Sequence, residues 1–128
     1  MTERHIFVVS SNSVRGGEDD YNKWYTDRHL DETLRVPGVV SAQRFRLHRD
    51  QMAGREPSPY EYLAIYECEG DVSAILAEFE RRRVTGELTY SVNYDTGGHP
   101  SDTAPDGRTP RPTGFFWTEI TPKRTANP

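Results

Sequence analysis

Four short segments of the chain carry the residues that favour β-strands. They are residues 5–11 (HIFVVSS), 39–48 (VVSAQRFRLH), 60–69 (YEYLAIYECE) and 115–121 (FFWTEIT). Each is rich in β-branched or aromatic residues, and turn-forming or charged stretches separate them. In the first and third segments, apolar side chains occupy both alternating sets of positions, so both faces of these strands require burial.

Two segments between the strands show helical patterns. Residues 20–36 follow a run of acidic residues, which favour a helix N-terminus, and end at a Pro-Gly pair. In residues 72–79 four apolar residues recur at helical spacing, shortly before three consecutive arginines. The predicted order is therefore βαββαβ, the arrangement of the ferredoxin-like α+β fold, in which two helices cover one face of a four-stranded antiparallel sheet.

The second face of this sheet needs a cover that the chain does not supply. Because the strands are apolar on both faces and no predicted element remains, we expect a second copy of the chain to pack there. Two sheets packed face to face form a dimeric α+β barrel. We therefore expect a homodimer with an interface of about 2,000 Å² or more.

The length of 128 residues suits one domain that spans residues 1–128. Within it, residues 96–114 (TGGHPSDTAPDGRTPRPTG) are so rich in Gly, Pro, Ser and Thr that no regular element is expected. We interpret this segment as an insertion that is either mobile or folded as an extended arm over a pocket or a partner.

Charge and composition exclude several classes of partner and cofactor. The net charge is −4 with acids and bases interspersed, so neither a nucleic acid nor a membrane surface is expected as a partner. The N-terminal apolar run is too short for a secretory signal, which favours a cytoplasmic protein. The single cysteine, Cys68, excludes an internal disulfide, and the four histidines match no ligand spacing. We expect no metal or other cofactor.

The first predicted helix carries the candidate chemistry. Steps of 100° per residue gather its charged side chains, Glu32 among them, on one arc. The opposite arc, which faces the sheet, consists largely of hydrogen-bonding residues: Asn22, Tyr25, Thr26, His29, Leu30 and Thr33. Unpaired buried polar groups cost about 1–3 kcal/mol each, so this arc indicates a cavity and not a packed core. His29 is the candidate general acid or base, although a structural histidine with satisfied hydrogen bonds is the alternative.

Further candidates for substrate binding come from the helix and the strands. Trp24 falls within the charged arc, so it either caps the helix edge or meets a loop or a partner chain. Tyr62 and Tyr66 share one strand face and either add hydroxyl groups to the cavity or pack in the core. Arg44 either grips a carboxylate in a bidentate manner or is solvated at the surface. The sequence does not determine which strand face meets the helices, and it shows no second titratable group beside His29.

With these residues identified, a family resemblance becomes visible. The segment YNKWYTDRHLDETLRVPGVVSAQRFRL, followed by YLAIYECEG, resembles the EthD-like branch of the dimeric α+β barrel superfamily. The resemblance covers the first strand through the second helix. It implies a homodimer with a pocket between the first helix and the sheet, and it implies that His29 points into that pocket. Asp31 departs from the proline that family members often have there, and the segment before the last strand is longer than usual.

The resemblance leaves the reaction open, because its relatives include cofactor-free isomerases, cyclases and monooxygenases. One hypothesis is a cofactor-independent lyase, isomerase or cyclase that acts on an aromatic, polyketide-like or lactone molecule. In it His29, with a pKa near neutrality, moves a proton next to a carbonyl while Tyr25 and Asn22 donate hydrogen bonds to the oxyanion. The alternatives are a non-catalytic binding or accessory dimer, and a cofactor-free monooxygenase of phenolic substrates.

Overall fold

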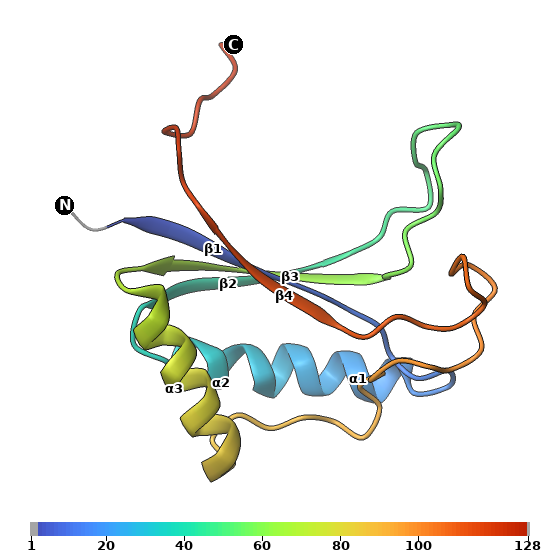
Figure 1. Ribbon diagram of the computed structural model, residues 1–128, viewed down its shortest axis with the longest axis horizontal. Coiled ribbons are helices and arrows are strands. Elements are labelled where there is room, and N and C mark those ends of the chain that lie inside the picture. Colours follow the sequence, from blue (N-terminus) through green and yellow to red (C-terminus); the bar gives the residue numbers. More distant parts are fainter. Residues whose placement is uncertain (1–2, 128) are drawn as a thin grey trace.

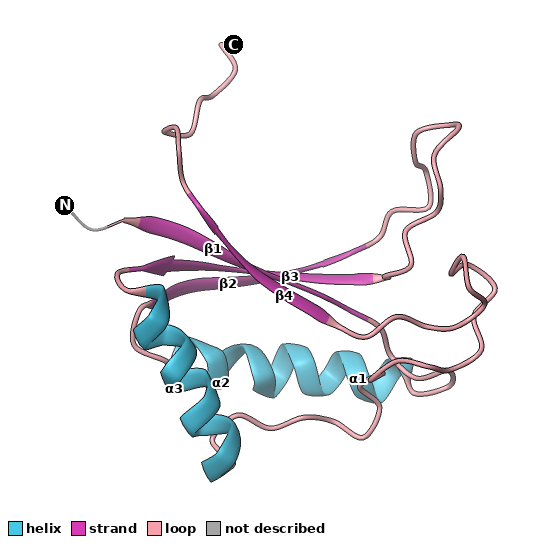
Figure 2. Ribbon diagram, in the orientation of Figure 1, coloured by secondary structure: helices cyan, strands magenta, loops and turns pink. Residues whose placement is uncertain are grey.

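A four-stranded antiparallel sheet with helices packed on one face forms the framework of the protein (Figures 1 and 2). The computed structural model describes residues 3–127. The strand order is β2-β3-β1-β4, and the predicted βαββαβ arrangement is confirmed. The strands are β1 (Arg4–Ser11), β2 (Val39–Arg46), β3 (Tyr62–Glu69) and β4 (Thr113–Thr118). The predicted boundaries differ from these by a few residues at most, as is usual at strand ends.

The first helical segment is continuous but not uniformly α-helical. It consists of α1 (Glu18–Trp24), a π-helical turn η1 (Tyr25–His29) and α2 (Leu30–Leu34). In the π-turn the Leu30 N–H bonds to the carbonyl oxygen of Tyr25, five residues back. Such a turn adds one residue to the helix, so every side chain after it is rotated by about 100° relative to a regular α-helix. The turn includes Tyr25 and His29, two of the candidate site residues.

The second helix, α3 (Val72–Thr85), has clear signals at both ends. The Asp71 carboxylate accepts a hydrogen bond of 2.9 Å from the Ser73 N–H, which satisfies one of the free donors of the first turn. Gly86 adopts a φ of 81° just after the last turn, a conformation that favours glycine. Both helices lie on the same side of the sheet (Figure 1).

The buried face of the sheet is set by the alternation of β3. Tyr62, Ala64, Tyr66 and Cys68 are all buried and point to the helices, which resolves the choice of strand face that the sequence left open. Across the ladder, Phe7 of β1 lies opposite Tyr66. Tyr21 of α1 is fully buried against this face.

The other face of the sheet carries no helix within residues 3–127 (Figure 2). Its central positions are apolar, and several large side chains are exposed there: Ile6 (37%), Phe45 (41%), Phe115 (59%) and Trp117 (60%). We call these four residues and their neighbours Val8, Leu63 and Ile65 the open face.

Residues 96–112 contain no helix or strand, in keeping with their composition. The segment begins at Asp95, which is buried and accepts hydrogen bonds from the Gly97 N–H and the Thr109 hydroxyl. That the segment is an insertion, either mobile or folded as an arm over a pocket or a partner, stays a prediction. Within residues 3–127, none of the helices combines the length and the apolar character needed to cross a membrane.

Candidate functional site

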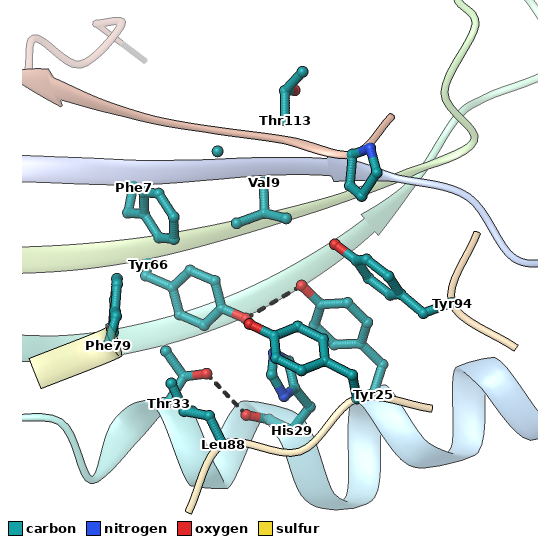
Figure 3. A pocket seen from close by; sticks show the side chains of 13 residues that line it. Phe7, Val9, Tyr25, His29, Thr33, Tyr66, Phe79, Leu88, Tyr94 and Thr113 are labelled. Atoms are coloured by element: carbon teal, nitrogen blue, oxygen red, sulfur yellow. Dashed lines mark hydrogen bonds between the residues drawn. The ribbon is translucent and has the colours of Figure 1, made fainter. Parts of the chain in front are cut away.

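A cavity of about 320 Å³ lies between the helices and the buried face of the sheet (Figure 3). Three predicted site residues on the first helical segment, Tyr25, His29 and Thr33, line it together with Tyr66 of β3. The rest of the lining is mainly aromatic or aliphatic: Phe7, Val9, Phe79, Leu88, Tyr90, Tyr94, Pro112, Thr113 and Gly114. Apart from His29 and the tyrosines, the described lining contains no titratable residue.

His29 is buried, with 7% of its surface exposed, and its two ring nitrogens have different surroundings. Nδ1 lies 3.3 Å from Oε1 of Glu32. For Nε2 no hydrogen bond with a described residue meets the usual distance and angle limits, although the Thr89 backbone lies close enough to the ring to favour its protonated form. Within residues 3–127 no buried side-chain nitrogen or oxygen lacks a partner. Nε2 is therefore not fully enclosed by protein, and because His29 lines the cavity, this nitrogen is the one that a bound molecule can reach.

Aromatic rings hold the imidazole in place. The Trp24 ring stacks on it with a centroid distance of 4.6 Å and an interplanar angle of 28°. Tyr25 meets it edge-on at 5.0 Å, and Tyr90 approaches at 5.3 Å. Burial in these surroundings lowers the pKa of His29 below its ordinary value, although Glu32 opposes the shift by favouring the imidazolium. The neutral imidazole, which can act as a base, is therefore the dominant form at neutral pH.

Glu32 is the residue for which the sequence-based prediction is wrong. It is 5% exposed and not part of a solvated arc, and it is the titratable neighbour of His29 that the sequence did not reveal. Its carboxylate lies inward, where it meets Thr89. Burial acts to raise the pKa of Glu32, but hydrogen bonds from Thr89, His29 and Arg28 outweigh burial and leave the pKa below its ordinary value.

Two tyrosines supply hydroxyl groups at the polar end of the cavity. The hydroxyl oxygens of Tyr25 and Tyr66 lie 3.4 Å apart, from helix and sheet respectively (Figure 3). Burial raises the pKa of both phenols, so both stay protonated at neutral pH. One hydroxyl proton suffices for the bond between them, which leaves the other available to a ligand oxygen. Thr33 uses its own hydroxyl to donate to the His29 carbonyl at 3.0 Å.

Four predicted site residues lie outside this cavity. Trp24 packs against the ring of His29, and its Nε1–H donates to the Thr89 hydroxyl at 3.1 Å. It therefore contacts a loop, which is one of the alternatives expected for this residue. Asn22, Arg44 and Tyr62 line a separate open groove on the other side of Tyr25. The structure thus does not bring these three residues to His29.

Arg44 packs against the first helical segment, and its expected role in binding a carboxylate stays a prediction. Its guanidinium lies 4.5 Å from the ring centroid of Tyr25. It donates to Thr26 Oγ1 and to Asn22 Oδ1, both at 2.9 Å. These bonds tie β2 to the helix. The Asn22 amide in turn donates to the Glu18 carbonyl and to the Tyr62 hydroxyl, so it is not free for an oxyanion.

The segment 86–95 contributes lining residues that the sequence analysis missed. Leu88, Tyr90 and Tyr94 come from this irregular stretch between α3 and the Gly/Pro-rich segment. The sequence signal that could have indicated them is the presence of two tyrosines in a segment with no predicted strand or helix, since such large side chains usually pack against another part of the protein. Within residues 3–127, no three His, Cys, Asp or Glu side chains are arranged to hold a metal ion.

Comparisons with known proteins give a consistent picture of the fold. Neither a protein-family model nor a curated protein matches the sequence. Among solved structures, HapK from Hahella chejuensis superposes with a TM-score of 0.57 at 15% identity, covering 98% of this chain and 99% of that one. An EthD-like protein from Ralstonia eutropha gives a TM-score of 0.56 at 13% identity, with 96% and 97% covered. An EthD family protein from Bacillus halodurans gives 0.53 at 11%, with 92% and 99% covered. The chain thus has the ferredoxin-like α+β fold of EthD-like proteins, which confirms the fold expected from its sequence motif.

Proposed function

We propose that this protein is an EthD-like enzyme in which His29 transfers a proton on a small aromatic, polyketide-like or lactone molecule, without a metal or organic cofactor. The observation that carries the proposal is that the two ring nitrogens of His29 have different surroundings. Nδ1 is held by Glu32, while Nε2 is the nitrogen left open on a cavity lined by aromatic side chains. A base that is fixed on one side and accessible on the other is the arrangement that general base catalysis requires.

The proposed step is removal of a proton from a carbon next to a carbonyl group. The Nε2 lone pair takes the proton, the C–H electron pair moves into the new C=C bond, and the carbonyl oxygen gains the negative charge. A hydroxyl of the Tyr25–Tyr66 pair donates to that oxygen as the charge develops. The imidazolium then returns the proton to another atom, which completes an isomerisation, or to a leaving group or a newly formed alkoxide, which completes an elimination or a cyclisation.

The lining favours a flat and uncharged substrate. Rings of Phe7, Phe79, Tyr66, Tyr90 and Tyr94 offer faces and edges for stacking, and each such contact contributes about 0.5–1.5 kcal/mol beyond area burial. Since the described lining carries no lysine or arginine, a carboxylate in the cavity would lose its hydration without gaining a counter-charge. Neutral ketones, lactones and phenols are therefore the substrate class that we propose.

Hydrogen exchange in D₂O tests the proposal without knowledge of the product. A panel of neutral aryl ketones and aromatic lactones is incubated with the protein, and deuterium incorporation next to the carbonyl is followed by NMR. We expect exchange with at least one compound, and we expect His29→Gln to lower its rate by roughly 10²–10⁴-fold. His48→Gln is the matched control, because His48 is exposed and distant from the cavity. Equal losses in both variants would contradict the role of His29.

The same aromatic lining supports a second candidate, a binding or accessory module that holds an aromatic metabolite without reaction. Stoichiometric binding by calorimetry, with no exchange for any bound compound, would favour this candidate. A cofactor-free monooxygenase of phenols is the third, and oxygen uptake with a bound phenol would favour it over proton transfer.

We propose further that the protein acts as a homodimer that pairs through the open face, and that it is cytoplasmic. The exposed Phe115 and Trp117 support the pairing, since a contiguous apolar patch on a sheet face is unusual for a monomer. Small uncharged metabolites as ligands are compatible with this location.

A further inference from the structure

We infer that Glu32 is a positioning residue that holds the proton of neutral His29 on Nδ1 and thereby presents the Nε2 lone pair to the cavity. The consequence for catalysis rests on the proposed function. The position of the proton does not, because it is a property of the free protein and can be measured without a substrate.

The hydrogen bonds around Glu32 support an ionised carboxylate. Thr89 donates its backbone N–H to Oε1 at 2.9 Å, and its hydroxyl lies 2.9 Å from both carboxylate oxygens. Arg28 donates its Nε–H to Oε2 at 3.1 Å. A carboxylate that receives several donors while buried is stabilised in its charged form, and in that form it only accepts hydrogen bonds. The contact with His29 Nδ1 is therefore a bond only if Nδ1 carries the proton.

Trp24 fixes the direction of the Thr89 hydroxyl. The Trp24 Nε1–H donates to Thr89 Oγ1 at 3.1 Å, so the single proton of that hydroxyl is free to point at Glu32. The same indole ring stacks on the imidazole at 4.6 Å. Trp24, Thr89 and Glu32 thus form one connected set that restrains both the plane of the His29 ring and the position of its proton.

The remaining titratable groups near the imidazole do not compete for Nδ1. Tyr25 on the same helix meets the ring edge-on, and Tyr90 from the segment 86–95 approaches at 5.3 Å, but neither forms a hydrogen bond with it among the described residues. Arg44 on β2 is directed to Asn22 and Thr26, and its charge only disfavours the imidazolium. The Thr89 backbone also favours the protonated ring. Among the titratable groups, Glu32 is therefore the one that selects between the two neutral forms of the ring.

The test is a long-range ¹H–¹⁵N correlation spectrum of protein labelled at histidine, recorded above the pH at which the imidazoles are protonated. His29→Gln identifies the His29 signals among those of the four histidines. We expect the wild-type ring to carry its proton on Nδ1. We expect Glu32→Gln to populate the Nε2-protonated form, because the glutamine amide can donate to Nδ1 and no longer requires a proton there. Glu78→Gln is the control, since Glu78 pairs with Arg81 and Arg82 on α3 and lies outside the cavity.

Two outcomes would overturn the inference: a wild-type His29 with its proton on Nε2, or an unchanged proton position in Glu32→Gln. The first needs no variant, so a poorly folded Glu32→Gln does not prevent a decision. Where exchange activity is found, Glu32→Gln should lower the plateau rate by at least about 10-fold and move the acid limb of the pH profile to lower pH. A drop in rate with an unmoved acid limb would indicate a purely structural role. If no compound exchanges, the proposed function fails while the NMR result still decides the role of Glu32.

Discussion

The two faces of the sheet use aromatic residues in opposite ways. On the helix-covered face, Tyr62 and Tyr66 are buried and their hydroxyl groups have partners. On the open face, Phe115 and Trp117 are more than half exposed and present only apolar surface or an indole edge. The first pair lies on β3 and the second on β4, and in each strand alternate side chains point to opposite faces of the same sheet. One face lines a largely aromatic cavity with a few polar groups, and the other is an exposed apolar surface.

Placing a charge on the open face should produce the largest effect. We expect Trp117→Glu to raise the dissociation constant of the proposed dimer by about 10³-fold or more, because an unpaired carboxylate would be buried at the centre of the interface. Sedimentation velocity over a range of concentrations measures this change. The ring is 60% exposed in the single chain, so the variant should still fold.

Val84→Glu provides the matched control for the open face. Val84 is 71% exposed on α3, on the helical side of the molecule, and should not affect association. A wild-type protein that stays monomeric at micromolar concentration, or a Val84→Glu variant that dissociates as readily as Trp117→Glu, would refute the proposed interface.

Removing one hydroxyl from the cavity should have an intermediate effect. Tyr25→Phe keeps the ring that packs on His29 and removes one partner of the hydroxyl pair. We expect the exchange rate to fall by roughly 10²-fold, as for the loss of one oxyanion donor, with the dimer and the melting temperature nearly unchanged. Tyr60→Phe is the control, since its hydroxyl donates to the Arg111 carbonyl outside the cavity. An unchanged rate in Tyr25→Phe would leave Tyr66 or Tyr94 as the donor.

The sequence predicted the framework well because the fold depends on repeated local patterns. Each of these patterns involves several residues, and all of them agree with one another: the strand composition, the Pro-Gly pair that ends the first helix and the apolar spacing in α3. The side of the helix on which His29 lies was also predictable, although the residue belongs to the π-turn itself. Its placement beside Tyr25 and Thr33 follows from the same helix face.

The parts that could not be predicted depend on single local events. Glu32 is buried because it meets Thr89, a residue of the loop after α3, and the path of that loop has no signal in the helical periodicity. Asn22 lies on the correct general side of the helix, but Arg44 occupies its side-chain oxygen, which no periodicity reveals. The contribution of Tyr90 comes from a loop whose path is set by tertiary packing.

The smallest predicted effect is on the pH dependence of stability, to which His29 and Glu32 contribute in different pH ranges. The pKa of His29 is lowered in the folded protein from its ordinary value of 6.5, so below that value the unfolded chain binds the proton more readily. The stability linked to His29 is therefore complete above pH 6.5 and decreases as the pH falls toward the folded pKa. The pKa of Glu32 is also lowered, from an ordinary value of 4.5, so its stabilising contribution is lost only at more acidic pH.

We expect the melting temperature of the wild-type protein to rise between about pH 5 and 7 more steeply than that of His29→Gln, while His48→Gln follows the wild type. Thermal denaturation followed by circular dichroism at matched ionic strength measures the difference. Parallel curves for wild type and His29→Gln would show that His29 is not buried in the neutral form. The contrast between a cavity that holds a buried neutral imidazole and an apolar open face would then no longer hold.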